Sequence, residues 1–303
     1  MLLARPAATN AAPSLTFAVP VIALTSALVH ATSTILVRRG YQRYGVYTAM
    51  WINVAVGTAV VWLAVLATGG VGTPSPAGIA YFALAGLIGT VAGRLLRFMS
   101  IEAVGPSTAA AVGNLSPLVS TLLAIVFLAE RVTAPTLVGT IVIILGTTLL
   151  STSGRGFTVR PGKLVLPLLS AACFGVVAVL RKVGLGGMAP LPGFAVNVTA
   201  AFLAFTAFLV ASRQTGEMAC RGRSLVYFAA AGVAENASVF MLVLALSLGT
   251  VSVVAPLASV SPIFVLVLSF FFLRGLEILT PRIVIGTLLI VAGGWLLTAL
   301  AGR

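Results

Sequence analysis

The sequence predicts an all-α membrane protein of ten transmembrane helices, arranged as a 5+5 inverted-topology repeat. Of the 303 residues, 60% are hydrophobic and 8% are charged, whereas charged residues make up about a quarter of a soluble domain. Apolar runs recur along the whole chain, which is typical of transmembrane helices. The segment ERVTAPTLVGTIVIILGTTLL near the middle returns near the end as EILTPRIVIGTLLIVAGGWLL.

Ten apolar runs lie between charged or Gly/Pro-rich borders. Each is close to the ~20 residues that cross a ~30 Å hydrocarbon layer at a rise of ~1.5 Å per residue. The predicted helices are 17–37, 46–67, 77–100, 106–128, 133–150, 164–180, 190–211, 224–247, 250–273 and 281–300. The first run exceeds a usual signal-peptide core and has only Arg5 before it, so we expect it in the mature fold.

The repeat extends over nearly the whole chain. Glu130 matches Glu277 at an offset of 147. Further matches are Asn53 with Asn197 at 144, Gly86 with Gly232 at 146, Gly105 with Gly249 at 144 and Pro117 with Pro262 at 145. We attribute the drift to loop insertions. The predicted organisation is a tail at 1–16, one repeat at 17–152, a linker at 153–163 and a second repeat at 164–301. Because five helices is an odd number, the second copy enters the membrane from the opposite side, as in many secondary transporters.

These features resemble a known family. FLAERVT…LVGTIVIILG and its echo FLRGLEILTP…IGTLLIVAGG are similar to the EamA-like branch of the drug/metabolite transporter superfamily. The resemblance implies exporters of amino acids, other metabolites or drugs in a bacterial plasma (inner) membrane. The second copy departs from the pattern, since Gly275 and Leu276 precede Glu277 where Ala129 precedes Glu130. We therefore expect both glutamates to be interfacial residues near a helix N-terminus and not a shared catalytic pair.

The composition limits the kinds of partner that the chain is expected to bind. The net charge of +13 comes from basic residues in small groups between apolar runs, which indicates lipid headgroups and not nucleic acid. Cys173 and Cys220 lie on different segments and predict neither a disulfide nor a metal site. Because soluble catalytic motifs and a P-loop are missing from the sequence, we expect no enzyme activity, cofactor or metal. The expected partners are a small-molecule substrate, the bilayer and protons as a coupling ion, in a monomer or homodimer.

Two predicted helices carry a central proline at matching repeat positions, Pro117 and Pro262. Proline frees the carbonyl group four residues earlier, and interrupted helices at corresponding positions are typical of a transporter site. We therefore include the polar neighbours Asn114, Ser116 and Ser259 among the substrate-binding candidates. The alternative is that both prolines only bend helices for packing.

Ionisable residues inside the spans give the other candidates. We expect His30, Arg94 and Glu235, with Asn236, to face a shared aqueous cavity, because such groups are costly in lipid. Arg94 would bind a substrate carboxylate or pair with Glu235. Glu235 is the candidate for proton coupling, since burial favours the protonated form of a carboxyl group. The alternatives are a structural Arg94–Glu235 pair and a hydrogen-bonded packing role for His30.

Two further polar features receive plainer interpretations. We expect Arg97 to extend to the interface. Asn53 and Asn197 are predicted to form hydrogen bonds between helices.

The membrane orientation stays open at this point. Eleven basic residues follow odd-numbered helices and five lie on the opposite side, which favours an outside N-terminus. The family resemblance implies cytoplasmic termini.

The predicted function is a secondary transporter of a small metabolite or drug-like molecule, working as an exporter by alternating access. One alternative is an uptake or exchange carrier for an anionic metabolite. Another is a membrane-embedded enzyme or lipid-headgroup flippase. An enzyme would need several convergent acid, base or metal groups, and only His30 and Glu235 qualify.

Overall fold

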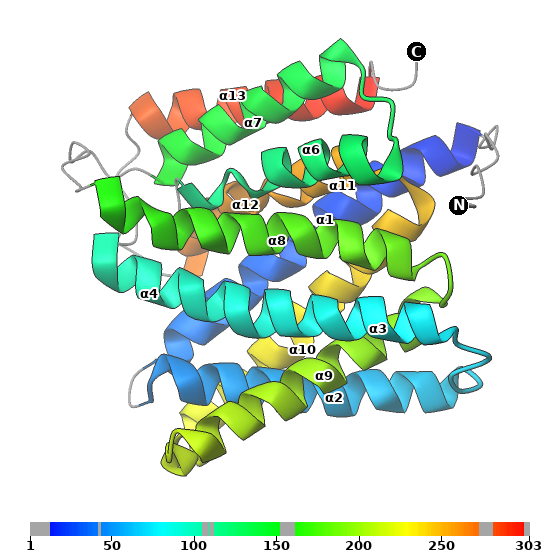
Figure 1. Ribbon diagram of the computed structural model, residues 1–303. Helices are drawn as coiled ribbons and strands as arrows, with labels where there is room; N and C mark the ends of the chain where they lie inside the picture. Colours follow the sequence, from blue (N-terminus) through cyan, green and yellow to red (C-terminus); the bar gives the residue numbers. More distant parts are fainter. Residues whose placement is uncertain are drawn as a thin grey trace.

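The computed structural model describes residues 13–41, 44–104, 109, 112–151, 161–272 and 281–299. Within these ranges every regular element is helical (Figure 1). The elements are α1 (Pro13–Gly40), α2 (Val46–Ala67), α3 (Pro76–Ala85), the π-helical η1 (Gly86–Gly93), α4 (Arg94–Val104), α6 (Ser116–Leu128), α7 (Ala134–Ser151), η2 (Pro161–Leu164), α8 (Val165–Gly184), α9 (Pro190–Ala211), η3 (Thr215–Met218), α10 (Arg223–Leu248), α11 (Val251–Ala258), α12 (Ser261–Phe272) and α13 (Pro281–Ala299).

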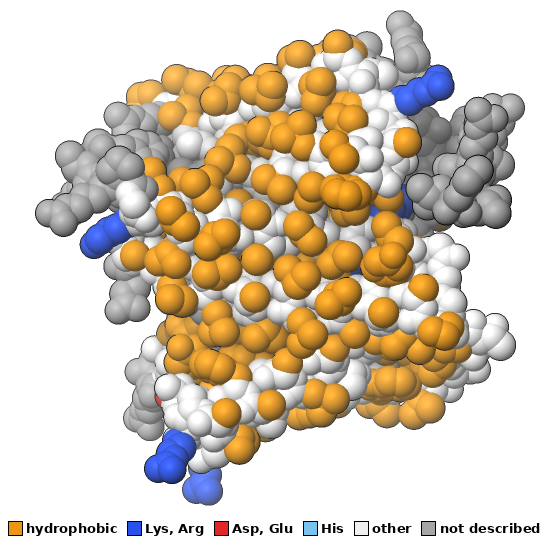
Figure 2. Space-filling model, in the orientation of Figure 1, with side chains coloured by type: hydrophobic (Ala, Val, Ile, Leu, Met, Phe, Trp, Pro, Cys, Tyr) orange, Lys and Arg blue, Asp and Glu red, His pale blue; other side chains and the backbone are white. Residues whose placement is uncertain are grey.

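The helices have the length and surface of a membrane protein. In the described ranges, six helices are long and apolar enough to cross a membrane, and four shorter apolar helices accompany them. Figure 2 shows hydrophobic side chains over the visible face of the bundle, with lysine and arginine side chains near its ends. Large exposed side chains such as Leu66, Val126 and Leu288 belong to this apolar surface. Such an exterior suits lipid and not water.

Three predicted spans are interrupted. The span expected at 77–100 continues through η1 and α4 to Val104, so it holds a π-helical segment that a uniform α-helix lacks. The span expected at 106–128 has a turn at 114–115, and α6 begins after it at Ser116. The span expected at 250–273 divides into α11 and α12. α2 and α9 have the expected ends.

Helices from the two copies alternate through the bundle. α1 packs along α10, and α8 packs along α3, η1 and α4. Ser26 of α1 donates its hydroxyl to the carbonyl of Ser238 at 2.9 Å. Ser170 of α8, the repeat counterpart of Ser26, donates to the carbonyl of Gly93 at 3.0 Å. Equivalent serines therefore join each copy to the other.

α7 and α13 form a separate pair at one side of the bundle (Figure 1). A Cβ atom at Gly139 would lie 2.9 Å from the carbonyl oxygen of Gly293, and one at Gly146 would lie 2.7 Å from that of Gly286. The residue order shows that the helices run antiparallel. Glycine permits this close approach, as it does between many membrane helices.

Candidate functional site

A cavity of about 720 Å³ lies between helices of both copies. This volume suits a small organic molecule. Its lining comes from α1, α2, η1, α4, α8, α9, α10, α11 and α12. The ionisable side chains among the lining residues are His30, Arg38, Tyr41, Arg94, Arg97, Arg181 and Glu235. Among the residues that the structure describes, four arginines thus face one carboxylate, and this lining is strongly cationic.

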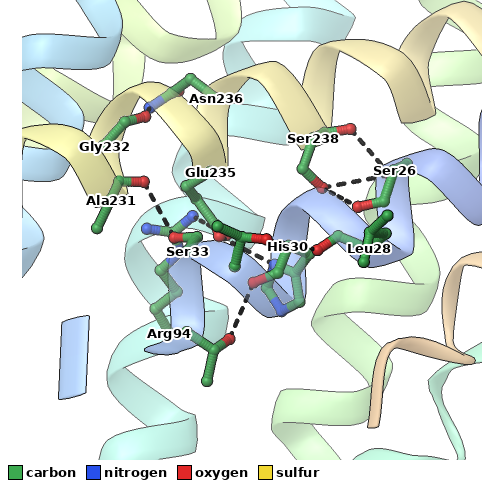
Figure 3. A network of polar contacts seen from close by, with 12 residues as sticks. Ser26, Leu28, His30, Ser33, Arg94, Ala231, Gly232, Glu235, Asn236 and Ser238 are labelled. Carbon is green, nitrogen blue, oxygen red and sulfur yellow. Dashed lines mark hydrogen bonds and ion pairs between the residues drawn. The ribbon is translucent and has the colours of Figure 1, made fainter. Parts of the chain in front are cut away.

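Glu235 on α10 lies at the centre of a charged cluster (Figure 3). Its Oε2 lies 2.9 Å from His30 Nδ1, and its Oε1 accepts from Arg94 Nη2 at 3.1 Å. The exposed fractions of the side chains are 34% for His30, 22% for Arg94 and 13% for Glu235. The structure therefore brings three candidates predicted from separate spans onto one cavity wall. It also shows that Arg94 pairs with Glu235.

Local structure positions each member of the cluster. His30 lies on the side of α1 that faces α10, where Ser33 donates to the carbonyl of Ala231 at 3.0 Å (Figure 3). Arg94 follows directly after η1. π-Helical segments inside α-helices occur frequently at functional sites.

Asn236 lines the cavity but also has a structural role. Its Nδ2 donates to the carbonyl groups of Asn53 at 3.2 Å and Gly232 at 2.8 Å. A Cβ atom at Gly57 would overlap the Asn236 amide. Asn236 therefore fixes α10 against α2, and the backbone of Asn53 takes part in the contact.

The proline-associated breaks lie where the repeat predicts them. α11 ends at Ala258 and α12 begins at Ser261, directly before Pro262. Pro117 is likewise the second residue of α6. Ala258 and Ser261 line the cavity. Ser259 donates its hydroxyl to the carbonyl of Pro256 at 2.7 Å.

The three polar neighbours proposed as ligands lie elsewhere. Among the residues that the structure describes, the lining of this cavity does not include Asn114, Ser116 or Ser259. The second break reaches the cavity through Ala258 and Ser261, so the backbone near the proline and not the adjacent hydroxyl lies at the wall.

Sequence reasoning missed Arg181 as a cavity residue. It counted Arg181 among the five basic residues on the side opposite the connections that follow odd-numbered helices, because Arg181 comes directly after the predicted helix 164–180. In the structure Arg181 is 7% exposed and lines the cavity. Its Nε donates to Oδ1 of Asn197, an interhelical hydrogen bond, at 3.1 Å. The available signal was the repeat, which matches the neighbouring Lys182 with Arg38 and leaves Arg181 opposite the apolar Val37. Arg97, expected at the interface, also lines the cavity and is exposed.

The two ends of the bundle differ. Arg38, Tyr41 and Arg97 line the cavity and are exposed. At the opposite end, Lys182 donates to the carbonyl groups of Leu246 and Gly249, each at 2.6 Å.

Glu130 makes further contacts between helices at this second end of the bundle. Its carboxylate accepts from the backbone N–H groups of Val251 at 2.8 Å and Ser252 at 3.1 Å. Glu130 therefore caps α11 of the other copy, and the carboxylate is favourable beside that helix N-terminus. Glu277, its repeat counterpart, lies outside the described residues.

Comparison with known proteins decides the family. The sequence profile of the EamA-like transporter family matches residues 18–152 and 162–299. The chain belongs to the EamA-like transporter family. This EamA-like protein is accordingly a multi-pass integral membrane protein and a transporter of small molecules.

Solved structures show the same fold. One described only as a crystal structure of a protein is similar over 94% of this EamA-like chain and 98% of its own, with a TM-score of 0.79 and 20% identity. No curated protein matches the sequence.

Proposed function

We propose that this protein is a secondary transporter that moves a small metabolite or drug-like molecule by alternating access between two inverted five-helix repeats. The observation that carries the proposal is a cavity between the copies that holds a charged cluster and is lined by exposed residues at one end, while Lys182 and Glu130 join helices at the opposite end. Such a cavity is one of the two states that alternating access requires.

The ends of the helices support this view. α1 and α8 end at opposite ends of the bundle (Figure 1). Arg38, near the end of α1, is exposed on the cavity wall. Lys182, near the end of α8, holds α10 and the following turn. Release of the Lys182 and Glu130 contacts would open the second end.

The packing of the copies supports the inverted repeat. The glycine contacts of α7 with α13 are antiparallel and join equivalent positions of the two copies. The hydrogen bonds of Ser26 and Ser170 likewise join equivalent positions, since each serine donates to a carbonyl group of the other copy. An inverted repeat gives two related states, because each copy can take the conformation of the other.

The charged cluster supplies a site for proton coupling. Glu235 contacts His30 through Oε2 and Arg94 through Oε1, so a proton on this carboxyl group would weaken both contacts at once. Glu235 would thus link proton movement to occupancy of the cavity. We propose export across a bacterial plasma membrane as the working direction, on the strength of the family.

Metabolite profiling tests the proposal. Cells with and without the chain are compared for metabolites inside and outside, and the compounds that change are assayed in proteoliposomes with and without a pH gradient. We expect at least one compound to move faster than in protein-free vesicles. If no compound differs in either assay, the transport proposal is wrong.

A further inference from the structure

We propose that the substrate is a small organic anion, and that Arg181 and Asn197 bind its carboxylate or phosphate group at the deep end of the cavity. The inference rests on the transport function proposed above and names the class of substrate.

The first step is the unused hydrogen-bonding capacity of this pair. Of the four arginines that line the cavity, Arg181 is the buried one, with 7% exposed. Only its Nε has a hydrogen bond to a described residue, the one to Asn197 Oδ1 at 3.1 Å. Asn197 is 1% exposed, and its Nδ2 is buried without a hydrogen-bond partner in the described part of the chain. The pair therefore offers guanidinium and amide donors with too few acceptors.

The second step is charge. Both ion pairs found among the described residues involve Glu235, which engages Arg94 and His30. A buried guanidinium without a carboxylate is costly, and an anion in the cavity would offset that cost. Arginine presents a planar fork that binds carboxylate and phosphate oxygens through two parallel hydrogen bonds. The free Nδ2 of Asn197 would donate to the same group.

The third step is that the fold does not require this arginine. The first copy has Asn53 where the second has Asn197, but it has Val37 where the second has Arg181. The equivalent helix crossing in the first copy therefore forms with an apolar side chain. If an arginine were needed here only for packing, both copies would be expected to have one.

The fourth step is the surroundings. Exposed Arg38 and Arg97 line the open end, so anions are attracted inward towards Arg181. Next to the pair, Phe174 and Val177 of α8 line the wall. Phe194 and Val198 of α9 line it beside Asn197. This arrangement fits an anionic group attached to an apolar body and not a small inorganic anion.

A binding experiment tests the inference directly. The purified chain in phosphatidylcholine nanodiscs is melted in the presence of phenylacetate, phenyl phosphate or the neutral phenylacetamide. We expect stabilisation by at least one anion and not by the amide. Arg181→Gln should weaken that anion about 10- to 100-fold, the size expected for loss of a charge-assisted bidentate contact. Arg223→Gln, which removes an exposed positive charge outside the cavity, should leave binding unchanged.

A second variant tests the inference even if Arg181→Gln does not fold. Asn197→Asp places a carboxylate beside Arg181 with little change of shape. It should raise the melting temperature of the free protein and abolish anion binding, because the internal carboxylate occupies the guanidinium. Retained anion binding in both variants would contradict the inference, and so would equal stabilisation by the amide or no stabilisation by either anion.

Two further measurements distinguish the inference from lipid binding and from the transport proposal. Nanodiscs with phosphatidylglycerol test for a lipid headgroup; Arg181-dependent stabilisation by that lipid alone would overturn the assignment to a soluble anion. Flux of the same three probes in proteoliposomes tests transport. Flux of the amide without anion binding would reject the inference and keep the transporter. Anion binding without flux of any compound would reject transport and keep Arg181 as an anion-binding residue.

Discussion

The third helix of each copy began as the same element and now differs at the site. In the first copy it is α3, η1 and α4, with eight residues in π-helical geometry from Gly86 to Gly93. In the second copy it is α10, a continuous α-helix of 26 residues. π-Helical segments are rare and occur mostly as short bulges inside α-helices. The interrupted helix carries Arg94 and the continuous one carries its partner, Glu235.

The repeat shows the size of the insertion. Gly86 matches Gly232 at an offset of 146. At the end of η1, the equivalent serines Ser26 and Ser170 donate to the carbonyls of Ser238 and Gly93 respectively, which makes those acceptors equivalent at an offset of 145. The first copy therefore has one extra residue within η1. One residue turns the helix by ~100° at ~3.6 residues per turn, so this difference between the copies sets the direction of Arg94.

Deletion of Leu87 should have the largest effect. Leu87 lies in η1 and is 40% exposed on the outside. Its removal should restore an α-helix and turn Arg94 away from Glu235, so we expect transport in proteoliposomes to fall on the order of 100-fold. Leu87→Ala, which keeps the chain length, should transport within about twofold of the parent. Normal transport by a folded deletion variant would show that η1 is not needed to place Arg94.

Glu235→Gln removes the carboxylate that α10 contributes to the charged cluster. Arg94 and His30, which are both partly exposed, would lose their common carboxylate, so stability should fall by about 1 kcal/mol. Transport should also lose its dependence on a pH gradient, because Glu235 is the proposed proton-coupling group.

The controls for this variant are His30→Gln and Arg94→Gln. Both keep the Glu235 carboxyl group, so transport by each should still respond to a pH gradient. An unchanged response to the gradient in Glu235→Gln would remove the coupling role.

Much of this arrangement was predictable from the sequence. His30, Arg94 and Glu235 stand out because each interrupts an apolar run, and ionisable groups in lipid are costly unless they face one another or water. The breaks before Pro117 and Pro262 follow from the missing backbone donor of proline. The family follows from motifs that cover both copies.

The remaining features depend on tertiary structure. The offset changes within an apolar run, which sequence reasoning assigned to loops, so η1 was missed although its signal was present. Arg181 lies three residues before the end of α8. Whether such an arginine extends to the headgroups or turns inward depends on the neighbouring helix, here α9 with Asn197.

The α7–α13 pair offers a symmetrical test of the copies. Gly139→Ala and Gly293→Ala would each place a Cβ atom within 2.9 Å of the opposite backbone, so each should lower stability by about 1–3 kcal/mol. The double variant should cost less than the sum, because one separation of the helices relieves both clashes. Gly294→Ala, where a Cβ atom would meet open space, should leave the melting temperature unchanged. Independent, additive losses would contradict a shared contact.

The smallest effect should come from Glu130→Gln at the end where Glu130 and Lys182 join helices. The amide can keep one hydrogen bond to the N-terminus of α11 but loses the charge, a change of about 0.5–1 kcal/mol. That energy corresponds to about a two- to fivefold larger population of the state open at this end. Val251 is fully buried beside Glu130. A Val251→Cys reporter, in a background with Cys173 and Cys220 replaced by serine, should therefore react faster with an impermeant maleimide by the same factor.

The repeat gives this last experiment a matched counterpart in Glu277→Gln. If the copies act at opposite ends, loss of the Glu277 charge should favour the state that is sealed here and slow labelling of the same reporter. Effects of opposite sign would show that the two glutamates stabilise opposite states. Acceleration by both would mean that each simply loosens the bundle, and the equivalence between the copies would then be one of ancestry and not of mechanism.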